Sequence, residues 1–159
     1  MEIDDSVAHT GDKSLKVVGI AATGVPYNAR IHQGGISVQD DQIFSVTFWA
    51  KVDATEGGSR EVEVNARMDI EPWSGFHWDT IILDSTDWKE YSHTFAVKTD
   101  EPGEMWIGLS IADSDVDFWI DDVGLFHGGP PDEIERIEMA VRPADKLPTS
   151  WGSIKSHFP

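Results

Sequence analysis

The chain has 159 residues, no cysteine and a formal net charge of −17 at pH 7. This length favours one domain, and the lack of cysteine excludes disulfide bonds and thiol chemistry. The negative charge repels nucleic acid phosphates and anionic membranes, and no apolar stretch reaches the roughly 18 residues of a membrane span, so we expect neither partner.

Strand patterns dominate the first 128 residues. The clearest is 43–52, where Phe44, Val46 and Phe48 share one face. The segments with alternation or β-branched enrichment are 14–20, 29–38, 43–52, 61–70, 80–83, 88–97, 105–111 and 118–126. Residues 53–60 are predicted to be a turn and 71–79 an aromatic-rich loop. No helical periodicity interrupts these strands, which favours an all-β fold: a sandwich or jelly roll.

The strand block ends at Gly128-Gly129-Pro130-Pro131. We therefore predict a β-sandwich over residues 1–128 and a C-terminal tail or linker over 129–159. Within the tail, residues 132–141 could form a short helix or a strand that joins the sandwich. The first residues lack the basic and apolar regions of a signal peptide, so we expect any export signal to lie upstream of Met1.

Four motifs in order carry a family resemblance: Gly11–Val17, Phe44–Lys51, Asp87–Phe95 and Phe118–Leu125. Together they resemble the carbohydrate-binding modules of the family 4/9/22 type over residues 9–126. The resemblance implies a jelly-roll sandwich of two antiparallel sheets that binds a polysaccharide or oligosaccharide and is not an enzyme. It also implies an extracellular or cell-surface location, in a monomer or a larger multidomain chain. Such modules usually carry a further strand before the first motif, which the tail around 134–141 could replace.

Candidate ligand residues fall into three groups. Sugar rings need flat apolar platforms with a few convergent polar groups, and the 71–79 loop offers such platforms in Trp73, Phe76 and Trp78. A second group lies opposite the core pattern of its strands: Trp106, Asn65, Arg67 and Asp69. These residues line a groove if that face is an open concave sheet, whereas Trp106 belongs to a second core layer if loops cover the face. The resemblance adds Arg30 and Gln33 as hydrogen-bond donors, although an exposed edge strand explains them equally well. Trp49 and Trp88 are interpreted as packing residues.

The resemblance also implies a structural calcium ion. It points to Asp121, or less strongly Asp122, with Asp12 opposite. Calcium takes six to eight oxygen ligands, and Asp4 or Asp5 could supply one more. The competing interpretation is that the two aspartates at positions 121 and 122 accept hydrogen bonds from backbone amides.

Two other function classes stay open. One is a protein-interaction or adhesion sandwich with no glycan ligand, which should show a flat exposed apolar patch. The other is a small jelly-roll polysaccharide lyase or hydrolase, which needs positioned carboxylates in a cleft. A glycan binder should instead expose Trp73 or Trp78 beside polar side chains. The sequence contains none of the common nucleotide, hydrolase or zinc-protease motifs.

Overall fold

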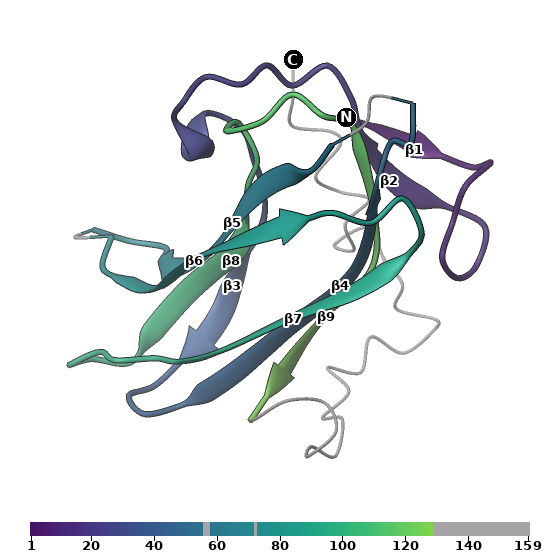
Figure 1. Ribbon diagram of the computed structural model, residues 1–159. Coiled ribbons are helices and arrows are strands. Elements are labelled where there is room, and N and C mark those ends of the chain that lie inside the picture. Colours follow the sequence, from purple (N-terminus) through teal and green to yellow (C-terminus); the bar gives the residue numbers. More distant parts are fainter. Residues whose placement is uncertain (56–57, 72, 129–159) are drawn as a thin grey trace.

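The computed structural model describes residues 1–55, 58–71 and 73–128, which form two antiparallel sheets (Figure 1). One sheet contains, in spatial order, β1 (Glu2–Asp4), β2 (Ser14–Val17), β9 (Phe118–His127), β4 (Ile43–Val52) and β7 (Lys89–Ala96). The other contains β3 (Arg30–Val38), β8 (Gly103–Ser110), β5 (Arg60–Met68) and β6 (Gly75–Leu83). A 3₁₀ turn, η1 (Pro26–Asn28), precedes β3. The predicted all-β jelly-roll sandwich is confirmed.

The core lies between the two sheets and follows the predicted alternation. On β4, Phe44, Val46 and Phe48 are buried, as are Met105 and Ile107 on β8. Successive side chains of a strand point to opposite faces, so each strand commits every second residue to the core. Burial of one such large apolar side chain stabilises the fold by about 1.5–3 kcal/mol. No helix among the described residues is long and apolar enough to cross a membrane.

The predicted 71–79 loop is wrong for most of its length. Strand β6 begins at Gly75 and pairs with β5 as far as Leu83. The register shifts once: Ala66 opposes His77 and Arg67 opposes Gly75, which leaves Phe76 as the extra residue of a bulge. Cross-strand hydrogen bonding therefore extends the strand through a segment whose aromatic and glycine content suggests a loop.

The N-terminal residues supply a strand before the first motif, where the family resemblance led us to expect one. Residues 2–4 form β1, which pairs with β2 at the edge of the five-stranded sheet. Asp4 anchors this edge by accepting hydrogen bonds from the Ser6 hydroxyl (2.6 Å) and the Trp119 indole (2.8 Å), which hold the pKa of Asp4 well below its usual value. The predicted tail, including 134–141, lies outside the described residues.

Arg60 departs from the predicted turn, because it begins β5 and is fully buried. Its guanidinium donates hydrogen bonds to the carbonyls of Val116 and Ile111 and lies 5.0 Å from the centre of the Phe118 ring. It thus ties β5 to the segment that leads from β8 into β9.

Replacing Arg60 with methionine should lower the free energy of unfolding by about 2–3 kcal/mol, because two buried carbonyls lose charged donors. Urea denaturation followed by tryptophan fluorescence measures this loss. Lys13→Met is the control, since Lys13 is exposed, and should change stability by less than about 0.5 kcal/mol. Equal stability of the two variants would contradict this role for Arg60.

Candidate functional site

A hollow of about 300 Å³ lies on the face of the four-stranded sheet that points away from the core. We call it the sheet groove. Its lining comes from η1 and from all four strands: Tyr27, Arg30, Glu63, Asn65, Arg67, Trp78 and Trp106. Strand alternation explains this set, because Trp106 lies between the core residues Met105 and Ile107 and therefore points to the opposite face.

Trp106 forms the floor of the groove. Only 6% of its surface is exposed, because two guanidinium groups lie over its ring. The Arg30 guanidinium carbon is 5.3 Å from the ring centroid and that of Arg67 is 5.8 Å away. The aromatic face and the two cations attract each other, so Trp106 fixes the arginines where their N–H groups can reach a ligand.

Asn65 and Arg67 each contain a buried polar atom that has no hydrogen-bond partner among the described residues. The Asn65 side-chain amide donates to the Ser110 hydroxyl (2.7 Å) and to the Glu63 carboxylate (2.9 Å), which fixes its orientation. Within the described part of the chain, Asn65 Oδ1 and Arg67 Nε are buried and have no hydrogen-bond partner. Both atoms are closed to solvent, so a ligand reaches neither of them unless these side chains move.

Two exposed tryptophans stand at one side of the groove. Trp78 on β6 is 54% exposed, and Trp73 in the preceding turn is 44% exposed. A Cβ atom added at Gly75 would lie 1.7 Å from the Trp78 ring, so only glycine allows the ring its position. The Arg67 guanidinium lies 5.8 Å from the Trp73 ring centroid and connects this tryptophan to the groove.

Trp73 adopts a left-handed backbone conformation, with φ of +58°. A residue with a Cβ atom pays roughly 1–2 kcal/mol for this conformation compared with the right-handed one. The turn is held by hydrogen bonds from Trp73 N–H to the Ile70 carbonyl (2.9 Å) and from Met68 N–H to the Ser74 carbonyl (2.8 Å). A large aromatic side chain thus stands where glycine or asparagine would be more stable.

His32 adds a neutral group beside the groove. Its ring lies 5.5 Å from that of Trp106. Burial lowers the pKa of His32, the nearby Arg30 lowers it further, and Asp69 partly opposes the shift. The imidazole is therefore uncharged at pH 7, so it acts as a hydrogen-bonding group rather than as a third cation.

The structure brings most of the predicted ligand residues together. Five of them line the groove: Arg30, Asn65, Arg67, Trp78 and Trp106. Trp73 stands next to Arg67, and the Asp69 carboxylate lies beside Gly34 near the Trp106 side chain.

Two predicted residues lie elsewhere. Phe76 packs against the core as the bulged residue of β6. Gln33 pairs with Ile107, an inward-facing residue, so its side chain points away from the groove face.

Two groove residues were missed by the sequence reasoning. Glu63 lies on the same strand face as Asn65 and Arg67, so the alternation of β5 already indicated it. Tyr27 is exposed in the short turn opened by Pro26, and no pattern in the sequence relates that turn to β5 and β8.

The remaining described tryptophans stabilise the outer face of the five-stranded sheet. The His9 ring stacks on Trp49 with centroids 3.8 Å apart. The Lys51 ammonium lies 5.9 Å from Trp88 and 5.0 Å from Trp119. These contacts agree with the interpretation of Trp49 and Trp88 as packing residues.

Asp12, Asp121 and Asp122, which were predicted to bind calcium, do not form a group whose ligand atoms all lie within 4.8 Å of one another among the described residues. Asp121 accepts hydrogen bonds from the backbone N–H groups of His9 (2.9 Å) and Thr10 (3.3 Å). Asp122 accepts one from the Thr10 hydroxyl (2.6 Å) and contacts His9 Nδ1 (2.7 Å). Both therefore hold the loop between β1 and β2 through protein donors.

Asp12 lies apart from that pair. Together with Asp5 it lines a hollow of about 250 Å³ formed by residues 5–8 and 11–12. Carboxylates and backbone carbonyls are suitable calcium ligands, so this hollow is a candidate position for calcium in addition to the predicted Asp121 and Asp122.

The chain matches the model of a known protein family. Residues 1–109 match the family model CBM_4_9, described as a carbohydrate binding domain. A search of curated proteins finds no match.

Three solved structures share the fold. A structure titled "CBM4 structure and function" has a TM-score of 0.63 and 17% identity, covering 79% of this chain and 78% of that one. The CBM22-1 xylan-binding domain of Xyn10C from Paenibacillus barcinonensis has a TM-score of 0.54 and 12% identity, with 79% of each chain covered. The C-terminal family 22 module of Clostridium thermocellum Xyn10B has a TM-score of 0.55 and 14% identity, with 80% of each covered. Since the family model matches well over half of its residues, this chain belongs to the CBM_4_9 family of carbohydrate-binding modules.

Proposed function

We propose that the sheet groove is the carbohydrate site of this module and that it binds the interior of a neutral polysaccharide chain. The observation that carries the proposal is an exposed Trp78 ring in a hollow whose lining also includes the half-buried polar side chains of Arg30, Glu63 and Arg67. The apolar ring face suits the C–H face of a sugar, and the polar atoms suit its hydroxyls. This combination favours a sugar over the flat apolar patch expected of a protein-interaction module.

The extent of the groove favours the middle of a chain over its end. Its lining runs from Arg30 on edge strand β3 to Trp78 on edge strand β6. Four strands spaced about 4.8 Å apart give a width of roughly 14 Å, which exceeds a single small ligand. A polysaccharide can enter over one sheet edge and leave over the other.

Charge supports a neutral ligand. Arg30 and Arg67 are balanced locally by Glu63 in the lining and by the neighbouring Asp69. The chain as a whole carries −17, which repels polyanionic glycans at a distance.

The same lining supports binding without catalysis. Glycoside hydrolysis requires two carboxyl groups across the bound sugar, and the described lining contains a single carboxylate, Glu63. We infer that the module acts outside the cell or at its surface, as one part of a longer protein. In Clostridium thermocellum xylanase 10B, a module with this fold is joined to a catalytic module.

Trp78→Ala should weaken binding of a neutral oligosaccharide by about 2 kcal/mol, or roughly 30-fold in Kd, because the stacking platform is lost. Isothermal titration calorimetry with xylo-, cello- and manno-hexaose identifies the ligand and measures the loss. Trp88→Ala is the matched control, since Trp88 immediately precedes β7 of the other sheet and the substitution should leave affinity unchanged. Failure of the wild type to bind any neutral glycan, or equal affinity of both variants, would argue against the groove.

Trp73→Gly should separate binding from stability. The left-handed backbone favours glycine, so the melting temperature should stay level or rise, while glycan affinity falls several-fold. Differential scanning calorimetry and the same titration test both parts. A clear drop in melting temperature together with unchanged affinity would show that Trp73 is a packing residue.

We also propose that calcium binds the hollow lined by Asp5 and Asp12. After treatment with a chelator, added calcium should raise the melting temperature, because an ion that binds only the folded state stabilises it. Asp12→Asn should reduce this increase, and Asp115→Asn, at another exposed position, should not. An identical melting temperature with and without calcium would exclude a structural ion.

A further inference from the structure

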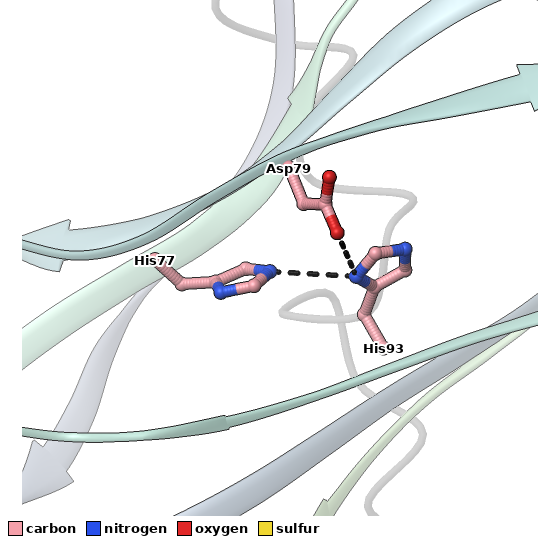
Figure 2. A group of neighbouring side chains, drawn as sticks. All are labelled: His77, Asp79 and His93. Atoms are coloured by element: carbon pink, nitrogen blue, oxygen red, sulfur yellow. Dashed lines mark hydrogen bonds and ion pairs between the residues drawn. The ribbon is translucent and has the colours of Figure 1, made fainter.

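Three metal-ligating side chains meet at the open side of the sandwich, where edge strands β6 and β7 face each other (Figure 2). His77 and Asp79 come from β6 and His93 comes from β7. Figure 2 shows the three side chains pointing toward one another across the gap between the strands. We propose that they form a binding site for a transition-metal ion, with Zn²⁺ as the best match.

Strand register explains why these residues meet. His77 opposes Ala66 and Asp79 opposes Val64, both core residues of β5, so these two side chains point inward. His93 opposes the core residue Val46 on β4 and also points inward. The sandwich therefore carries one polar layer at an edge where neighbouring inward positions, such as Ile81 and Phe95, are apolar.

The separations between the nitrogen and oxygen atoms fit tetrahedral coordination. His77 Nε2 lies 3.4 Å from His93 Nδ1, and His93 Nδ1 lies 3.5 Å from Asp79 Oδ2. All three ligand atoms lie within 4.8 Å of one another. Two ligands at about 2.0–2.1 Å from a tetrahedral zinc ion are roughly 3.3–3.4 Å apart, so a single ion can reach all three atoms with small side-chain adjustments.

The contacts within the group are long, so a metal ion can replace them at little cost. Both contacts of His93 Nδ1 are longer than the usual hydrogen-bond length of about 2.9 Å. The other oxygen of Asp79 accepts the Thr80 backbone N–H (2.8 Å), which orients the carboxylate and leaves Oδ2 toward the histidines. The His77 ring is also oriented, because it stacks on Phe95 with centroids 5.2 Å apart.

The donor set selects the kind of ion. Two imidazoles and one carboxylate suit Zn²⁺ and similar transition metals, whereas Ca²⁺ and Mg²⁺ prefer sites made only of oxygen. The Asp79 side chain is 57% exposed, so water can reach the site and complete the coordination.

The position of the site links it to the groove. Trp78 lies between the two β6 ligands in sequence and points to the opposite face of the strand. A metal bound by His77 and Asp79 would join β6 to β7 and hold the strand that carries Trp78. This link depends on the proposed function of the groove, but the metal site itself does not.

Calorimetric titration of the metal-free chain with ZnCl₂ tests the proposal. We expect saturable binding of one ion, with at least a tenfold loss of affinity for Asp79→Asn and for His93→Gln, since even the loss of an outer-shell partner typically costs 10–100-fold. Asp79→Asn keeps the oxygen that binds the Thr80 amide, so the variant should fold. Asp100→Asn, in the exposed turn after β7, is the control and should bind as the wild type does.

Two further readouts separate this site from others. Co²⁺ in place of Zn²⁺ should give the visible absorption of a tetrahedral ion, and Asp79→Asn should abolish it. Zinc should raise the melting temperature of the wild type and of Trp78→Ala equally, so the site can be tested whether or not the groove binds glycan. Absence of zinc binding, or equal zinc binding by wild type, Asp79→Asn and His93→Gln, would overturn the proposal.

Discussion

The antiparallel pairing of β5 with β8 determines which side chains reach the groove, because each strand must divide its residues between two faces. Arg67 lies directly opposite Trp106, and Asn65 lies opposite Gly108. The intervening residues, such as Ala66 and Ile107, are buried in the core. A slip of one residue would bring polar groups into the core and apolar ones into the groove. The strand register that keeps the core residues buried therefore also fixes the order of the groove residues.

Near β6 the groove exposes two tryptophan side chains, and the backbone at one of them adopts a less stable conformation. Trp73 adopts a left-handed backbone, and Trp78 occupies space that only a glycine at position 75 leaves free. Neither ring is buried, so neither recovers the energy that an aromatic side chain gains in a core. Strain of this kind persists where the surrounding structure holds it and where a ligand benefits from it. The outer face of the five-stranded sheet contrasts with this, since Trp49 there is stacked on His9.

Edge strands β6 and β7 carry polar side chains on the inward face of the sandwich. Most inward positions are apolar, but His77, Asp79 and His93 interrupt the apolar series with groups that need partners. Figure 1 shows these two strands on facing sheets, joined directly by the short connection after β6. The contacts of His93 with His77 and Asp79 join β7 to the strand that carries Trp78.

The sequence alone indicated an all-β sheet fold, the inward faces of β4, β5 and β8, and three of the groove residues, because a period of two is a local property of the chain. Arg67, Asn65 and Trp106 could be placed opposite the core from that period. The aromatic content of residues 71–79 added Trp78, and the family resemblance added Arg30. Tertiary structure decided what depends on pairing between distant segments. It turned residues 75–79 into strand, moved Phe76 to the core through a bulge, and brought Tyr27 to the groove. It also brought His93 to His77 across two sheets, since contacts between strands follow from register and packing rather than from sequence spacing.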